Sequence, residues 1–389
     1  MEWLSGGKTG DARRLVGQLH DPVRRDRAIR GLLQMGASAA SALTDALGTK
    51  DQELLLLYQQ ILVHLGKSAT PALIRTLNEA HPVMRVHAAE ILAQTRDRAA
   101  LPELMDALQG EFYTVRAQAA LALGQIQDPR AIPLLAEAAK DLEPTVRSAA
   151  AHALGSFADP RTFEKLGDLL LDDPEIEVRR AAAQALGMTH RAEAIPLLFD
   201  ALRDSFWWYE REGGLEELLD AITDMGERAI PELIEALREP EGTVRKLAAS
   251  LLARLPDPRA LEPLTISLYD THFDVCQASA NALAAIGKPA LPVLLNALHH
   301  PEAWIRQQAI LGLTKLDTPE VIPALLNLMD DENAEVRKQV IQSLAELHAS
   351  SALPALKALA SSRGNREFST LAKQAIQEIN SAQPAAKKG

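Results

Sequence analysis

The stretch VRAQAALALG, residues 115–124, recurs with variations along almost the whole chain. We define the slot as the position of Arg116 in this stretch, and we align the other copies on it. The aligned slots hold Arg25, Leu55, Arg85, Arg116, Arg147, Arg179, Leu215, Arg245, Cys276, Arg306 and Arg337. Successive slots lie 30 to 32 residues apart, except for one gap of 36. A fixed period of about 31 residues predicts a solenoid built from repeated units.

Each unit contains two predicted helices. Val115, Ala119 and Leu123 mark one face of a helix with a period of 3.6 residues, and we name this helix B. Its small residues allow neighbouring helices to approach closely. An apolar run such as residues 132–135, with Pro133 in its first turn, precedes it and forms helix A. The sequence therefore predicts an all-α fold, a right-handed α-solenoid of about 11–12 two-helix repeats.

The slot arginine lies in the first turn of helix B, where the helix dipole disfavours a cation. An acidic residue six positions before a slot can compensate this charge, and such residues are Glu79, Asp141, Asp173, Glu239, Asp270 and Asp331. We predict a structural ladder between units that includes Arg85, Arg116, Arg147, Arg179, Arg245, Arg306, Arg337, Asp141, Asp173 and Asp331. Residues two positions before a slot are predicted to cap helix B, namely Thr114, Thr145, Thr243 and Asp274.

These motifs resemble those of a known superfamily. The segments DPRAIPLL at 128–135, TVR at 145–147 and ALG at 153–155 are similar to HEAT repeats, in the short bacterial form called the phycobilisome-lyase HEAT-like repeat. Matches to the pattern cover roughly residues 10 to 380. The resemblance implies the solenoid fold, and it leaves the function open because the family is functionally diverse.

Composition narrows the classes of function. The net charge of -11 argues against a surface that mainly binds phosphate, although a local patch can override the total. The single cysteine, Cys276, excludes an intrachain disulfide and a cysteine-based zinc site. No apolar run approaches the length of a membrane span. A cytoplasmic location is therefore expected.

Continuous repeats predict one elongated domain at residues 10–380, preceded by a flexible leader at 1–9 and followed by a disordered tail at 381–389. The first unit is strongly basic, with Arg24, Arg25, Arg27 and Arg30 in its second helix. This cluster is the best candidate for a phosphate or nucleic-acid patch. We favour the alternative that it is the solvated face of a capping repeat.

The regularity breaks at residues 204–214, where about five residues are inserted between helices A and B. The insertion carries Phe206, Trp207, Trp208, Tyr209 and Arg211, and other aromatic residues fall in the equivalent turns: Phe112, Tyr113, Phe273 and Trp304. Since exposed aromatic side chains are costly in water unless they bind something, these residues predict a partner-binding strip along one edge. The alternative is that the insertion folds back as a structural plug.

Two residue pairs suggest chemistry only weakly. Cys276 and His272 have the types of a nucleophile and its base, but helical spacing between them is doubtful. His87 and Glu90 supply at most two metal ligands, whereas a transition-metal site usually needs three or more. We therefore predict no catalytic residues, no metal and no cofactor.

The leading hypothesis is a non-enzymatic scaffold or adaptor that binds a protein or peptide through the solenoid surface, with the aromatic insertion as anchor. The family resemblance implies one alternative, a bilin lyase-like or chaperone-like protein. A nucleic-acid-binding HEAT-like protein is the other, and the acidic composition disfavours it. The sequence does not set the oligomeric state.

Overall fold

The computed structural model describes residues 3–157, 159–208, 214–362 and 366–382, and it divides into two compact units. Unit 1 is Met1–Met225 and unit 2 is Gly226–Gly389. The described residues form α-helices and short 3-10 helices, with no strand among them. The predicted all-α solenoid is confirmed. A single domain over residues 10–380 stays a prediction, and each unit is described by itself.

Helices alternate between the A and B positions of each repeat. In unit 1 the pairs are α1 (Trp3–Gln18) with α2 (Arg25–Met35), α3 (Ala37–Asp45) with α4 (Gln52–Leu65), α5 (Thr70–Glu79) with α6 (Pro82–Thr95), α7 (Leu101–Ala107) with α8 (Tyr113–Ile126), α9 (Ile132–Ala138) with α10 (Pro144–Ser156), α11 (Pro160–Asp172) with α12 (Ile176–Met188), and α13 (Ile195–Arg203) with α15 (Gly214–Asp224). The short helix α14 (Ser205–Trp208) interrupts the last pair. Helix α1 begins inside the segment 1–9 that the sequence suggested as a leader.

Unit 2 continues the alternation. Its pairs are α16 (Ile230–Ala236) with α17 (Gly242–Arg254), α18 (Leu261–Ser267) with α19 (Phe273–Ile286), α20 (Leu291–Ala297) with α21 (Ala303–Leu316), α22 (Val321–Asn327) with α23 (Ala334–Glu346), and α24 (Leu353–Ser361) with α25 (Arg366–Ala382). Many A helices are preceded by one 3-10 turn: η1 (Gly66–Ser68), η2 (Arg98–Ala100), η3 (Pro129–Ala131), η4 (Ala192–Ala194), η5 (Gly226–Ala229), η6 (Pro258–Ala260), η7 (Lys288–Ala290) and η8 (Ser350–Ala352).

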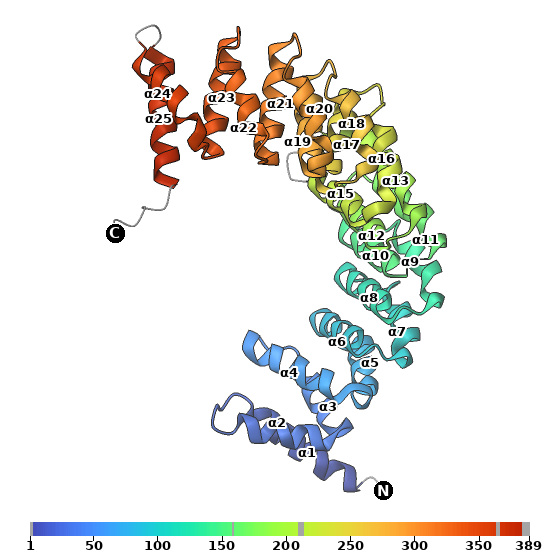
Figure 1. The fold of residues 1–389 in the computed structure, drawn as a ribbon. Coiled ribbons are helices and arrows are strands. Elements are labelled where there is room, and N and C mark those ends of the chain that lie inside the picture. Colours follow the sequence, from blue (N-terminus) through green and yellow to red (C-terminus); the bar gives the residue numbers. More distant parts are fainter. Residues whose placement is uncertain (1–2, 158, 209–213, 363–365, 383–389) are drawn as a thin grey trace. The chain divides into compact units, whose positions relative to one another are not determined.

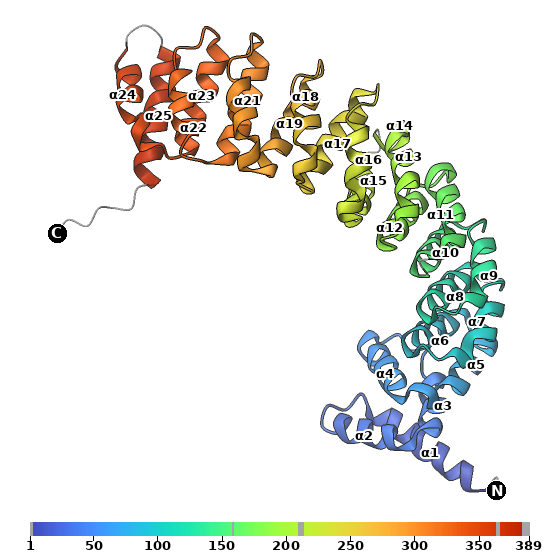
Figure 2. The ribbon, with the colours of Figure 1, turned by 45° about the vertical axis from the view of Figure 1, so that its right-hand side comes forward.

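Within unit 1, successive B helices pack against one another along the chain, and the A helices from α5 to α13 lie beside them in a second layer (Figures 1 and 2). The core between the layers consists mainly of Ala, Leu, Ile and Val side chains, as the composition predicts. The turn from helix A to helix B repeats at one end of every pair. Slot residues and the predicted aromatic strip both lie at this turn.

Small residues set the closest approach between B helices. A Cβ atom added at Gly124 of α8 would lie 2.7 Å from the Cα of Ala153 in α10, and one added at Gly155 of α10 would lie 2.6 Å from the Cβ of Ala185 in α12. These distances are far shorter than a normal carbon–carbon contact. The glycine eight positions after the slot therefore fixes how closely consecutive repeats stack in this part of unit 1.

Candidate functional site

The slot arginine joins two consecutive repeats through its guanidinium group. Arg147 Nε and Nη2 donate to the two carboxylate oxygens of Asp173 at 2.7 and 2.9 Å, and Nη1 donates to the carbonyl oxygen of Asp141 at 3.0 Å. The Asp173 side chain is only 4% exposed. A bidentate, charge-assisted pair of this kind is stronger and more directional than a single hydrogen bond between neutral groups.

The same ion pair recurs in both units, with one hydrogen bond to the carboxylate in place of two at Arg179 and Arg306, and we call the set the arginine ladder. Its members are Arg116–Asp141 at 2.7 Å, Arg147–Asp173 at 2.7 Å, Arg179–Asp204 at 3.0 Å, Arg245–Asp270 at 2.7 Å and Arg306–Asp331 at 2.7 Å. Each arginine pairs with the aspartate of the following repeat. Glu79 and Glu239, which the sequence placed in the ladder, follow repeats whose slots are Leu55 and Leu215, so no slot guanidinium is available to face them.

The ladder carboxylate also organises the turn. Asp141 Oδ1 accepts a hydrogen bond from the backbone N–H of Glu143 at 2.9 Å, and Asp270 Oδ1 accepts one from the N–H of His272 at 2.9 Å. Arg116 and Arg245 hold the pKa of Asp141 and Asp270 below the ordinary value although burial raises it, and for Asp270 the pKa is about 2. Both carboxylates are therefore ionised at neutral pH.

The prediction of the helix B caps was wrong by two residues. The residues at the N-cap are Phe112, Glu143, Glu241 and His272, whereas Thr114, Thr145, Thr243 and Asp274 lie inside the first turn. The ladder aspartate of the repeat already hydrogen-bonds the N-cap backbone in two of these helices. This contact holds the backbone at the N-cap itself, and no capping side-chain hydrogen bond forms in these four helices.

Cys276 occupies a slot in place of arginine. Its buried thiol donates to the carbonyl oxygen of Asp270 at 3.1 Å, the contact that Nη1 makes in an arginine slot. Burial and the charge of Asp270 raise the pKa of Cys276 to about 12. The His272 ring faces Asp270 Oδ1 at 3.1 Å. The arrangement holds a neutral thiol and does not support the reading of these residues as a nucleophile and base.

The insertion contributes to the core of unit 1. Trp207 is 0% exposed, and the Phe206 ring lies 3.8 Å from the guanidinium carbon of Arg179 in the ladder. Trp207 therefore fills the turn as a structural plug, which corrects its place in the predicted partner-binding strip. The side chain of Trp208, and Tyr209 and Arg211 altogether, lie outside the described residues.

Other aromatic side chains of the predicted strip are exposed at the start of helix B. In unit 1, Phe112 and Tyr113 are 39% and 46% exposed. In unit 2, Phe273 is 47% exposed and its ring centre lies 6.3 Å from that of the half-buried Trp304. Along the chain, Phe112 and Tyr113 precede the ladder arginine Arg116, Trp304 precedes Arg306, and Phe273 follows the ladder aspartate Asp270. Each unit thus presents a small aromatic surface beside a rigid, charged turn.

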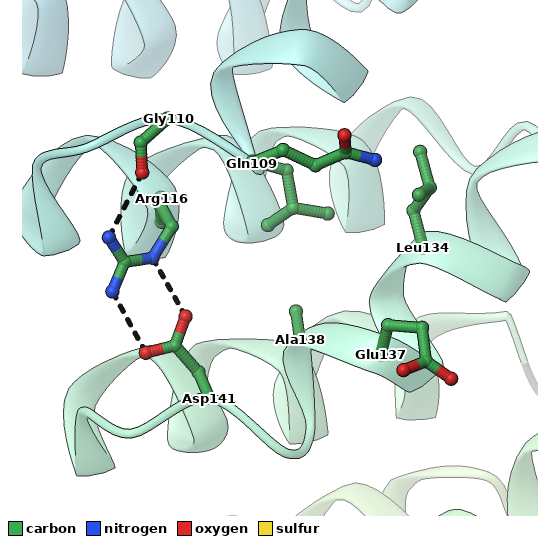
Figure 3. Close-up of a pocket in the computed structure, with 8 residues that line it drawn as sticks. Gln109, Gly110, Arg116, Leu134, Glu137, Ala138 and Asp141 are labelled. Atoms are coloured by element: carbon green, nitrogen blue, oxygen red, sulfur yellow. Dashed lines mark hydrogen bonds and ion pairs between the residues drawn. The ribbon is translucent and has the colours of Figure 1, made fainter.

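A surface pocket of about 400 Å³ lies next to the aromatic pair of unit 1 (Figure 3). Leu108, Leu134 and Ala138 supply its apolar side chains, and Gln109 and Glu137 are its polar residues. The remaining lining residues are Gly110, Arg116 and Asp141. The ladder pair Arg116–Asp141 lies at one end of the pocket, where the hydrogen bonds drawn in Figure 3 hold both side chains.

Two arginines of the basic cluster, Arg24 and Arg25, and two of α1, Arg13 and Arg14, pair with neighbouring acids. Arg13 pairs with Asp45, Arg14 with Asp11, Arg24 with Asp21 and Arg25 with Glu53. Arg27 and Arg30 are exposed on α2. Pairing with carboxylates lowers the positive potential that a phosphate backbone requires. This geometry favours the capping interpretation of the cluster.

The candidate metal ligands are engaged in a polar network. The Gln59 side-chain amide donates to Glu90 at 2.9 Å and lies 3.3 Å from His87 Nδ1. Within the described ranges, no group of three His, Cys, Asp or Glu residues is placed to hold a metal ion. Among the same residues, no helix is long and apolar enough to cross a membrane.

A sequence model for HEAT repeats matches residues 70–155, 135–218, 230–309 and 291–377, which is more than half of the chain. The chain is 35% identical over 150 residues to phycocyanobilin lyase subunit beta of Pseudanabaena tenuis, covering 35% of this chain and 51% of the relative. It is 33% identical over 88 residues to the uncharacterized protein SkfG of Bacillus subtilis, covering 22% and 51%. The matches span about half the length of these curated relatives.

Two solved structures share the fold. The karyopherin Kap121p, bound to the extreme C-terminus of the protein phosphatase Cdc14p, superposes with a TM-score of 0.59 at 13% identity, covering 95% of this chain and 49% of the other. Kap95p, from a structure with RanGDP, gives a TM-score of 0.54 at 12% identity, covering 95% and 60%. At such low identity the likeness shows the fold alone.

Proposed function

The chain belongs to the HEAT-repeat family, and from this premise we propose that it is a non-enzymatic scaffold or adaptor for a protein or peptide partner. The carrying observation is the exposure of Phe112, Tyr113 and Phe273 at the starts of B helices. Aromatic residues make up only 4% of the chain, so their collection at the same turn of different repeats is not a consequence of abundance.

The physical argument rests on rigidity. Phe112 and Tyr113 directly follow Gly110 and Glu111, whose carbonyl oxygens accept hydrogen bonds from Arg116, and Asp141 holds Arg116 in turn, so the aromatic surface is preformed. A preformed surface loses little conformational entropy on binding, and aromatic side chains contribute large contact areas. The karyopherin neighbour, whose structure holds the C-terminal segment of another protein, is an example of this fold binding a peptide.

The test is a comparative pull-down from lysate of the native cells, with the wild type and two aromatic variants. The variants are Phe112→Ser/Tyr113→Ser in unit 1 and Phe273→Ser in unit 2. Met188→Ser and Ile266→Ser are matched controls, because these side chains are 69% and 66% exposed elsewhere in the same units. We expect at least one aromatic variant to lose a prey protein at least tenfold while the controls keep it. Equal recovery in all variants would contradict the proposal.

The lyase relative supports a second candidate, a bilin lyase-like or chaperone-like protein. In that role an exposed aromatic surface such as Phe112 and Tyr113 would stack against a tetrapyrrole. Mixing the purified protein with phycocyanobilin should then shift the absorbance spectrum of the pigment. A spectrum identical to that of the free pigment would argue against this candidate. In either role we place the protein in the cytoplasm, since its single buried cysteine fits a reducing compartment.

A further inference from the structure

Among the described residues, two slot arginines, Arg85 and Arg337, lack the carboxylate partner that the others have. The other slot arginines pair with a carboxylate of the following repeat. The guanidinium carbon of Arg337 instead lies 4.9 Å from the centre of the Phe368 ring. Within the part of the chain that the structure describes, Arg85 has neither a carboxylate nor an aromatic ring as a partner. The Arg85 Nε is buried without a hydrogen-bond partner. The ladder carboxylate stands six positions before the next slot, and for Arg85 that position is Gly110.

A complete step of the ladder is a slot arginine paired with the aspartate of the following repeat. The turn at Gly110 makes the same backbone hydrogen bond as the turn of such a step. The N–H of Gly110 donates to the carbonyl oxygen of Ala107 at 3.1 Å, and the N–H of Asp141 donates to that of Ala138 at the same distance. A Cβ atom added at Gly110 would lie 3.9 Å from Arg85 Nη2. The place of the carboxylate is therefore formed by the backbone, and only the side chain that would fill it is missing.

The open step lies beside the aromatic surface and the pocket. Gly110 lines the 400 Å³ pocket of Figure 3, and Phe112 and Tyr113 follow it in the chain. Val83, two residues before Arg85, is also exposed. One guanidinium group without a counter-ion thus adjoins several apolar groups. Glu111 and Glu137 lie in the same turn and pocket, so their charge disfavours a strongly acidic ligand.

We propose that the open step at Arg85 binds the carboxylate of an aspartate or glutamate in a partner peptide, with an adjacent apolar side chain in the pocket beside Gly110. The complete steps define this chemistry, because the guanidinium at Arg116 and at Arg147 takes a planar carboxylate through two hydrogen bonds. The motif is a single acidic residue flanked by apolar residues. The proposal rests on the proposed function in that the ligand is a peptide.

The test is fluorescence anisotropy with a fluorescein-labelled pool of amidated peptides of the form Xaa-Leu-Asp-Leu-Xaa, compared with the matched Xaa-Leu-Asn-Leu-Xaa pool. We expect the wild type to bind the aspartate pool at least tenfold more tightly. Arg85→Gln should abolish this preference. Gly110→Asp should abolish it as well, because the new carboxylate occupies the guanidinium, and it should do so without lowering the melting temperature. Arg30→Gln, at an exposed arginine of α2, should keep the preference.

Equal binding of the two pools by the wild type would overturn the proposal, and so would an aspartate preference that survives in Gly110→Asp. The pull-down separates this result from the proposed function. Prey that is lost on Phe112→Ser/Tyr113→Ser but kept on Arg85→Gln overturns the carboxylate site and leaves the scaffold role standing. A melting temperature of Gly110→Asp equal to that of the wild type shows that loss of binding in this variant does not reflect unfolding.

Discussion

Two neighbouring turns of unit 1 share a backbone hydrogen bond and differ at the position of the ladder carboxylate. In the turn before α10, Asp141 binds Arg116 with two hydrogen bonds and closes the step between repeats. In the turn before α8, Gly110 leaves Arg85 without a carboxylate. The same position of the repeat therefore serves stability in one turn and leaves a charged group available in the next.

Removing a guanidinium from a complete step should have the largest effect. We expect Arg147→Ala to lower the free energy of unfolding by about 3 to 4 kcal/mol, because the Asp173 carboxylate is left almost fully buried without its partner. Urea unfolding followed by circular dichroism measures the change.

The control is an exposed ion pair in a helix. Arg238 and Glu235 form a pair whose side chains are 64% and 69% exposed. Arg238→Ala should change the unfolding free energy by less than about 0.5 kcal/mol. Similar losses in the two variants would mean that the closed steps contribute no more than ordinary surface pairs, and the contrast with Gly110 would lose its energetic basis.

A substitution that forces stacked repeats apart should have the next largest effect on the free energy of unfolding. Gly155→Ala should cost about 2 to 3 kcal/mol, since the added Cβ would meet Ala185 at 2.6 Å and α10 and α12 would have to separate. Gly17→Ala in α1 meets nothing within 4 Å and should stabilise the chain by about 0.5 to 1 kcal/mol. If alanine destabilises the chain in place of Gly155 and stabilises it in place of Gly17, then the packing contact, and not helix propensity, determines the change in unfolding free energy. A neutral Gly155→Ala would show that the stack relaxes easily.

The charge of Asp270, which pairs with Arg245, should be visible in the pH dependence of the unfolding free energy. Asp270 has a pKa of about 2, below its ordinary value, so its contribution is complete above about pH 4 and is lost as the pH falls toward 2. At pH 7, Asp270→Asn should be about 2 kcal/mol less stable than the wild type, and the two should converge near pH 2. Urea midpoints measured from pH 7 to pH 2 test this. A constant difference across the range would show that the loss comes from packing.

Much of the fold follows from the sequence because the repeat is local. Val115, Ala119 and Leu123 fix the face of helix B, and the proline of helix A fixes its first turn, so both helices appear wherever the pattern does. The match of arginine with the aspartate of the next repeat also follows from spacing. The N-caps do not, because the residues at four of these positions, Phe112, Glu143, Glu241 and His272, make no capping hydrogen bond, so no residue-type signal marks them.

The candidate site was less predictable. Trp207 and Phe112 are both aromatic residues before a B helix, but one is fully buried and the other is exposed. That difference depends on how α14 packs, which no local pattern encodes. The open step at Arg85 carries a signal in the sequence, since Gly110 stands where Asp141 stands one repeat later. Its significance emerges only when the guanidinium is seen to lack another partner.

The smallest effect on stability is expected for the substitution that gives Arg85 a carboxylate partner. Gly110→Asp should raise the unfolding free energy by about 1 kcal/mol, because a new pair forms with the half-buried Arg85 and the chain loses the backbone freedom of glycine. The added Cβ lies 3.1 Å from the carbonyl oxygen of Ala107, a tight contact that limits the gain. In Arg85→Gln the same substitution should give no gain from pairing, so a double-mutant cycle isolates the ion pair. Equal gains in both backgrounds would mean that the carboxylate introduced by Gly110→Asp does not pair with Arg85, and that Gly110 is not an open step of the ladder.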